Sequence, residues 1–241
     1  MYPIQYQVKH LKKSMYPIKC PYEMKPEFIV VHNTSNVASA ANEISYMTTN
    51  LNEVSFHIAV DDKGAIEGIP LNRNAWACGD GSKGSGNRKG IQVEICYSAN
   101  NHHLFDKAEE NAIKLIAFML KDRGWGVEKV KKHQDFSRKY CPHRTLDRGW
   151  NRFLELVEKE MLTMIDKEIN DESHCTNGSF LIRVTCDELN IRQSHSFSSP
   201  VVGVVKRGEV FTIVEVQGQL GKLKSGKGWI SLNAPYVEKL K

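Results

Sequence analysis

Hydrophobic positions along the chain follow two different spacing patterns, and the change between them lies near residue 180. Before it, short runs of β-branched and apolar residues alternate with longer segments in which apolar residues recur every three or four positions. The short runs predict buried strands, and the longer segments predict helices that pack one face on a core. The expected strands are 28–32, 56–61, 65–69 and 91–97, and the expected helices are 36–50, 108–126 and 146–169.

After residue 180 apolar and polar positions alternate, and Gly, Ser and Pro separate the runs, which predicts short strands and turns. The preceding polar segment NDESHCTNGS contains Asn-Gly and is typical of a linker. We therefore expect a first domain at 1–168, a linker at 169–179 and a small all-β domain at 180–241. Residues 1–26 contain four prolines and are expected to form a short helix or an extended arm along the first domain.

Composition agrees with one domain of ordinary size and one small domain, because 241 residues with 41% hydrophobic and 25% charged positions are typical of globular proteins. The formal net charge of +5 is unevenly distributed: residues 176–241 hold nine Lys and Arg against five Asp and Glu. This excess suits contact with an anionic polymer, and a merely soluble surface explains it equally well. We expect no nucleic-acid partner.

The six cysteines show no paired spacing and no CxxC motif, which indicates a reduced protein and not a disulfide framework. The first residues, MYPIQYQVKHLKK, lack the apolar core of a signal peptide. No segment is long and apolar enough to span a bilayer. The expected product is therefore synthesised in the cytoplasm without a signal peptide.

Candidate chemistry is concentrated in the segment HQDFSRKYCPHR, residues 133–144. His133 and Cys141 lie eight residues apart on an expected loop before a helix, and His32 ends the apolar run FIVVH. Two imidazoles and a thiolate are ligands that zinc prefers, and three protein ligands leave a fourth coordination position open, as in catalytic zinc sites. Glu94 lies on the fourth expected strand, where it alternates with apolar residues, and it is placed to accept a proton from water at such a site.

Two other histidines compete for a place in this site. His57 lies in the expected hairpin and is either a fourth ligand or a strand histidine that is hydrogen-bonded or contacts substrate. His143 follows Pro142, which keeps the chain extended after Cys141, so these side chains diverge and only one of them can be a ligand. The Gly-rich segment 72–90 allows close approach of the backbone to a ligand, but no GK[ST] follows and no helix is expected to start there, so we reject a phosphate cradle.

Five segments occur in an order that resembles the type 2 N-acetylmuramoyl-L-alanine amidases, in particular endolysins and autolysins of Gram-positive bacteria and their phages: VVHNTS, SFHIAVDDKG, GDGSKGSGN, IQVEIC and HQDFSRKYCPHRTLDRGW. The likeness covers roughly residues 15–160. It implies an α/β fold with a mixed central sheet flanked by helices. It also implies a Zn²⁺ hydrolase that acts on the peptidoglycan of Gram-positive cell walls after release, and that cuts the amide between N-acetylmuramic acid and the L-alanine of the stem peptide.

The resemblance assigns roles to individual residues. It implies that His32, His133 and Cys141 hold the zinc ion, with Cys141 preferred over its neighbour His143. Glu94 matches the catalytic glutamate of the family. Lys139 stands two residues before the metal cysteine, where a cation helps to stabilise the tetrahedral oxyanion.

Substrate contacts are expected near the same motifs, from Asn33, Thr34, His57, Asp80 and Asn87. The chain also departs from the family pattern. Relatives often have tyrosine where this chain has Phe56, and histidine just before the GDG-type segment, where this chain has Ala77 and Cys78. These departures affect contacts in the substrate groove and leave the metal ligands unchanged.

The end of the chain resembles a bacterial Src-homology-3-like domain in LNIRQSHSFSSPVVGVVKRGEVFTIVEV and GWISLNAPYVEKL. The resemblance implies a small all-β, barrel-like module that holds the protein on the cell wall. Trp229 and Tyr236 either form part of a wall-binding groove or fill the small core.

Three alternatives stay open at this point. A catalytically silent peptidoglycan-binding protein of the same fold commonly lacks the metal cysteine, whereas Cys141 and Glu94 are both present. A purely structural zinc would require a fourth protein ligand, for which His57 and His143 are the candidates. An amidase of cytosolic wall-recycling fragments fits the missing signal peptide, but a soluble fragment needs no wall-binding domain.

Overall fold

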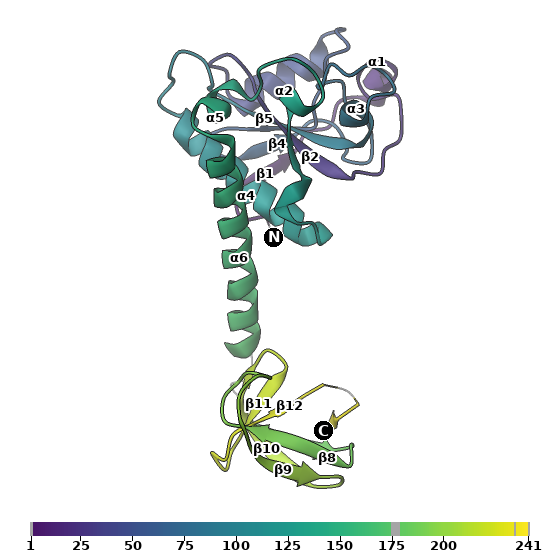
Figure 1. The fold of residues 1–241 in the computed structure, drawn as a ribbon. Coiled ribbons are helices and arrows are strands. Elements are labelled where there is room, and N and C mark those ends of the chain that lie inside the picture. Colours follow the sequence, from purple (N-terminus) through teal and green to yellow (C-terminus); the bar gives the residue numbers. More distant parts are fainter. Residues whose placement is uncertain (1, 175–178, 234, 241) are drawn as a thin grey trace. The chain divides into compact units, whose positions relative to one another are not determined.

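The computed structural model describes residues 2–174, 179–233 and 235–240. The chain forms two compact units, Met1–Leu162 and Thr163–Lys241. Figure 1 shows a sheet with helices around it in the first unit, and in the second unit the end of helix α6 followed by strands.

A mixed sheet of six strands, counted within the described residues, forms the centre of the first unit (Figure 1). β3 and β4 are antiparallel, whereas β3, β5, β2 and β6 are joined by parallel pairing, as are β1 and β4. The predicted α/β fold with a mixed sheet is confirmed. The strand order is β1 (Tyr6–Val8), β4 (Ala65–Glu67), β3 (Ile58–Val60), β5 (Gly90–Ile95), β2 (Phe28–Asn33) and β6 (Val130–Lys132).

The central strands β2 and β5 are almost entirely buried because both faces of the sheet are covered, and most of their residues are apolar. Their pairing places His32 opposite Glu94 and Val30 opposite Gln92, and paired residues share a face of the sheet. Polar side chains therefore gather on one face near the carboxyl ends of parallel strands, where α/β sheets commonly bind ligands. The residues of β2 and β5 with no exposed surface include Ile29, Val30, Val31, Ile91, Val93 and Ile95.

Helices α2 (Ala40–Thr49) and α4 (Phe105–Arg123) pack on the strands β3, β4 and β5. Ser39 caps the start of α2 by accepting a hydrogen bond from the Asn42 backbone nitrogen. Gly124 ends α4 with φ of 63°, a left-handed conformation that glycine adopts at little cost. Among the residues that the structure describes, no helix combines the length and the apolar character that crossing a bilayer requires.

The helix predicted at 146–169 differs in its bounds. The structure has a short helix α5 (His143–Asp147) and then α6 (Trp150–His174), which are separated at Gly149 with φ of 101°. A left-handed glycine cannot continue an α-helix, which explains the break. Residues 169–174, expected to begin the linker, are helical, and residues 175–178 lie outside the described residues.

Residues 2–26 combine the two expected forms, an extended arm and a short helix. The extended part adds β1 to the sheet edge beside β4. The Tyr6 hydroxyl donates to Glu67, and His10 Nε2 lies 2.6 Å from Glu67 Oε1, so the arm is fixed to β4 by side chains as well. The 3-10 helix η1 (Lys13–Met15) and α1 (Tyr16–Lys19) follow.

In the second unit, the described residues from 179 on form one antiparallel sheet with the order β13-β7-β10-β11-β12-β8-β9. The prediction of an all-β C-terminal domain is confirmed. Alternate residues of these strands form a single apolar core of Ile182, Val184, Leu189, Ile191, Val205, Ile213, Leu223 and Ile230. The strands are β7 (Phe180–Val184), β8 (Glu188–Arg192), β9 (Val201–Lys206), β10 (Val210–Gln217), β11 (Leu220–Leu223), β12 (Trp229–Ser231) and β13 (Val237–Lys239).

Candidate metal centre and active site

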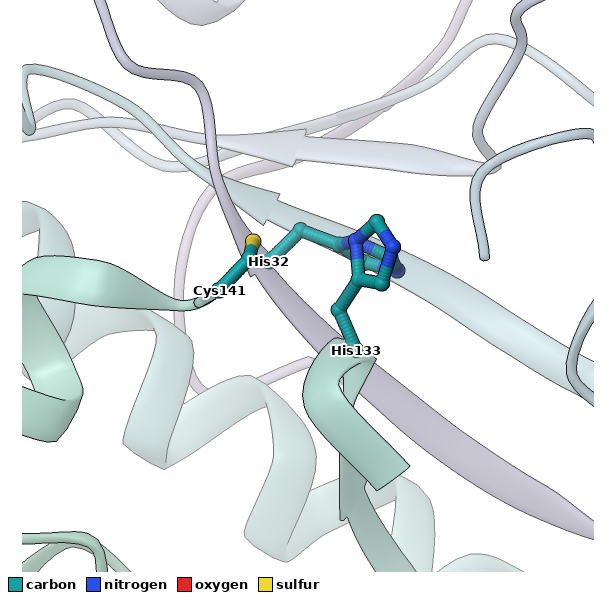
Figure 2. A group of neighbouring side chains, drawn as sticks. All are labelled: His32, His133 and Cys141. Carbon is teal, nitrogen blue, oxygen red and sulfur yellow. The ribbon is translucent and has the colours of Figure 1, made fainter. Parts of the chain in front are cut away.

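His32, His133 and Cys141 meet from three separate parts of the first unit (Figure 2). His32 lies near the end of β2, His133 starts the 3-10 helix η3 (His133–Asp135) directly after β6, and Cys141 precedes α5. One ligand atom from each residue lies within 4.8 Å of the others, and all three side chains are buried. The structure thus brings together the three residues that the sequence singled out.

The two imidazoles present the same nitrogen to each other. His32 Nδ1 and His133 Nδ1 are 3.0 Å apart, and His32 Nε2 lies 2.8 Å from Gln92 Oε1. The Cys78 carbonyl accepts a hydrogen bond from the His133 ring. A Cβ placed on Gly79, whose φ is 67°, would lie 4.0 Å from His133 Nε2, so this backbone borders that nitrogen. With the outer nitrogens protonated, both Nδ1 lone pairs point to one place, which suits a metal cation.

Both histidines are neutral at pH 7, which is the form that binds metal. Burial and, to a smaller extent, the neighbouring His133 lower the pKa of His32 to about 3. Burial and the charge of Lys139 lower the pKa of His133 to about 4. Neither ring carries a positive charge that would repel a divalent ion.

Cys141 supplies the third candidate ligand atom. Burial and the negative charge of Glu94 raise the pKa of its thiol to about 11, while the backbone amides of Asn33 and His143 and the charge of Lys139 lower it. Zinc binds the thiolate form of cysteine, so a metal ion held by Cys141 would displace the thiol proton. Two backbone donors at the sulfur already favour the anion, and the donor set of two imidazoles and one thiolate fits zinc.

The rival histidines are engaged elsewhere. His57 has no exposed surface; its Nε2 donates to the Arg73 carbonyl at 2.8 Å and its Nδ1 accepts from the Gln92 backbone nitrogen at 2.9 Å. His143 Nε2 lies 3.2 Å from the Ser98 carbonyl oxygen. The predicted substrate contact of His57 is therefore corrected to a structural one. Over the described residues no fourth ligand joins the cluster, which argues against a purely structural zinc.

A hollow of about 300 Å³ opens beside the cluster and is lined in part by Asn33, Thr34, Glu43, Glu94 and Lys139. Glu94 Oε2 and Thr34 Oγ1 are buried and have no hydrogen-bond partner within the described part of the chain. Burial and the charge of Glu43 raise the pKa of Glu94 to about 8, and Lys139 opposes this shift. The unpaired Glu94 oxygen is available to a substrate or a water molecule.

The Gly-rich segment beside the cluster is held by its own side chains. Asp80 accepts hydrogen bonds from the backbone nitrogens of Gly86 at 2.7 Å and Asn87 at 3.2 Å. Asn87 Oδ1 accepts from the backbone nitrogens of Ala77 and Cys78. The expectation that no helix starts here is wrong, because α3 (Ser85–Lys89) forms one turn within the segment.

Three of the residues predicted to contact substrate thus make hydrogen bonds within the protein. The Asp80 and Asn87 side chains shape the Gly-rich segment, and Asn33 Oδ1 accepts from the backbone nitrogens of Arg144 and Thr145 at the start of α5. Asn33 still lines the hollow beside Glu94. Asn87 lines a second hollow of about 540 Å³ together with the aromatic Tyr22 and Trp76. Asn33 and Asn87 therefore hold the walls of the two hollows.

Comparison with known proteins decides the family. The protein-family model described as N-acetylmuramoyl-L-alanine amidase matches residues 22–144, just over half of the chain, and this range contains the metal cluster, Glu94 and Lys139. This chain belongs to the N-acetylmuramoyl-L-alanine amidase family. The prediction of an amidase, and hence of an enzyme, is confirmed.

Relatives of this amidase include proteins of Bacillus subtilis (strain 168). It is 46% identical over 213 residues to the N-acetylmuramoyl-L-alanine amidase CwlA, covering 86% of this chain and 76% of CwlA. It is 54% identical over 152 residues to the amidase XlyB, covering 63% of this chain and 48% of XlyB, so it spans about half of that relative. The solved structure of PlyL matches with a TM-score of 0.62 and 51% identity over 64% of this chain and 98% of PlyL.

The second unit of the amidase matches the bacterial SH3 domain model over residues 187–238. Trp229 is only 7% exposed; its ring contacts His195 at a centroid distance of 5.5 Å, and Lys222 Nζ lies 5.6 Å from its ring centroid. Trp229 is therefore almost fully buried, which agrees with the second of the two roles left open for it, filling the small core. Tyr236 is 45% exposed and stays a candidate for wall contact.

Sequence reasoning missed Gln92, which has no exposed surface and contacts His32. A signal was present, because Gln92 alternates with Ile91 and Val93 on the same strand as Glu94. A glutamine on a strand buried on both faces requires buried hydrogen-bond partners. The position of Gln92 in the sequence therefore predicts a polar neighbour on the sheet face that carries Glu94.

Proposed function

We propose that this amidase is a zinc-dependent peptidoglycan hydrolase of the endolysin and autolysin type, which cleaves the amide between N-acetylmuramic acid and the L-alanine of the stem peptide. One observation carries the proposal. The paired Nδ1 atoms of His32 and His133 and the Cys141 sulfur converge beside a hollow that contains the unpaired Glu94 oxygen. The protein, made in the cytoplasm, acts on the Gram-positive cell wall after release.

The residues divide the chemistry among them. His32, His133 and Cys141 hold the zinc ion, which when bound supplies a Lewis acid for amide hydrolysis. Glu94 accepts the proton of the attacking water and passes it to the leaving amine of L-alanine. Lys139, on the same hollow, offers its ammonium to the negative charge that develops on the scissile carbonyl oxygen. Thr34 Oγ1 is available to the substrate as a hydrogen-bonding group.

The bond that is cut identifies the activity. Purified Gram-positive cell walls should release amino groups of L-alanine without new reducing sugar ends, and a zinc chelator should stop the release until zinc is added back. Reducing ends would contradict amidase specificity. Sedimentation with the walls without release would favour the silent binding protein, and release from soluble muropeptides but not from walls would favour the recycling enzyme.

Lys139→Met is expected to lower kcat by about 10²–10³-fold with little change in KM, because one cationic donor to the oxyanion is lost. Arg138→Met is the matched control, since Arg138 is also exposed and does not line the hollow. Steady-state kinetics on a soluble muramoyl peptide separate the two parameters. A rise in KM with unchanged kcat would contradict the oxyanion role.

The bacterial SH3 domain is proposed to hold the enzyme on the wall, and Tyr236 is its candidate contact. Tyr236→Ala is expected to weaken binding of the full chain to purified walls by about fivefold or more, as loss of an exposed aromatic anchor does. Leu181→Ala is the control, because Leu181 is also 45% exposed on this unit. Sedimentation isotherms measure both, and equal binding of the two variants would exclude Tyr236.

A further inference from the structure

Gln92 occupies a buried position between a metal-cluster histidine and the Gly-rich segment. It lies on β5 two residues before Glu94 and has no exposed surface. The other side chains of β5 with no exposed surface are apolar, and a carboxamide buried among them costs free energy unless its donors and acceptor are all used. In this structure both donors and the acceptor of the Gln92 carboxamide have hydrogen-bond partners.

The orientation of the Gln92 amide follows from its partners. Its Nε2 donates to the carbonyl oxygens of Gly86 at 2.6 Å and Gly90 at 2.9 Å. Carbonyl oxygens only accept, so the NH₂ group must face them and Oε1 must face the opposite way. There Oε1 lies 2.8 Å from His32 Nε2 and 3.2 Å from Cys78 Sγ, and both of these groups can donate to it.

This orientation decides the tautomer of His32. Oε1 has no proton to give, so His32 Nε2 must carry the hydrogen of the neutral ring, and Nδ1 must present its lone pair. That lone pair points to Nδ1 of His133, 3.0 Å away, within the cluster that includes Cys141. The direction in which His32 can bind a cation is therefore set by two glycine carbonyls acting through Gln92.

We propose that Gln92 is a positioning residue of the zinc site, which fixes the tautomer and the ring orientation of His32 and couples this ligand to the Gly-rich segment. The proposal rests on zinc binding by the cluster. Without the amide oxygen, the His32 proton is free to move to Nδ1 and the ring to rotate, and both changes oppose metal binding. Loss of an outer hydrogen-bond partner of a ligand typically weakens metal affinity by about 10–100-fold.

The test measures zinc affinity of the full chain by competition with a chromogenic chelator. Gln92→Met is expected to bind zinc about 10–100-fold more weakly than the native protein, and its cobalt-substituted form to have an altered absorption spectrum. Asn111→Leu is the matched control. Asn111 is a buried amide whose Nδ2 also donates to two backbone carbonyls, of Asp61 at 2.8 Å and Asp62 at 3.1 Å, but it has no contact with the cluster.

A second variant separates the effect of Gln92 on the orientation of His32 from its effect on the stability of the Gly-rich segment. Gln92→Glu keeps an oxygen toward His32 but gives up donors to Gly86 and Gly90, so its thermal midpoint should fall while zinc affinity stays within about threefold of native or rises. Native affinity in Gln92→Met, or a tenfold loss in folded Gln92→Glu, would overturn the role of Gln92. If the native chain itself bound no zinc, the proposed function would fail instead. If Gln92→Met does not fold, Gln92→Glu decides alone.

Discussion

Glu94→Ala is expected to lower the rate of amide cleavage by about 10²–10⁴-fold while zinc affinity stays within about threefold of native. Glu94 lines the hollow beside the cluster, and its Oε2 is buried without a hydrogen-bond partner in the described chain, so this oxygen is free to accept a proton. It is not among the three residues whose ligand atoms converge. Release of L-alanine amino groups and chelator competition measure the two quantities on one preparation.

Glu43→Gln provides the matched control for that variant. Glu43 lines the same hollow, and burial also raises the pKa of its carboxyl group, but it accepts a hydrogen bond from Asn36 and lies on α2. We expect its substitution to change the rate by less than about tenfold. Near-native wall hydrolysis by Glu94→Ala, or an equal loss in both variants, would contradict the assignment of Glu94 as the base.

Cys141→Ser is expected to weaken zinc binding by more than about 100-fold and to abolish activity at ordinary zinc concentrations. This loss of affinity exceeds the one that follows when a residue outside the ligand set is changed. The hydroxyl is a poor substitute for a thiolate as a zinc ligand. The substitution is nearly isosteric, so the fold should persist. Zinc affinity and far-ultraviolet circular dichroism of the purified variant check both statements.

Cys20→Ser controls for the loss of a buried thiol as such. Cys20 has no exposed surface and lies outside the metal cluster. It should keep native zinc affinity and activity whatever its effect on stability. Comparable zinc affinity in Cys141→Ser and Cys20→Ser would show that the sulfur of Cys141 is not a ligand.

The grouping of the metal cluster could be anticipated because two histidines and a cysteine, each weak as a signal alone, together match the ligands that zinc prefers and the pattern of the amidase family. His32 ends an apolar strand, and His133 and Cys141 flank a polar loop before a helix. Parallel pairing of β2 with β5 and β6 then brings these ends together. Alternation alone fits an ordinary strand glutamate at position 94, and the resemblance to the family assigned Glu94 its role; the register opposite His32 agrees with that role.

Roles that depend on partners distant in sequence could not be read in the same way. His57, Asp80 and Asn87 looked like groove residues, but each bonds backbone groups that only the folded chain brings near. The edge strands β1 and β6 have three residues each, too few for a period to show, and β6 carries two lysines.

The most direct test of a zinc amidase at this site is titration of the metal-free full chain with zinc while release of amino groups from cell walls is followed. We predict no activity before zinc is added, a linear rise, and saturation at one equivalent per chain. His133→Ala should stay inactive throughout the same titration. Full activity of protein shown to be metal-free by elemental analysis would contradict the account.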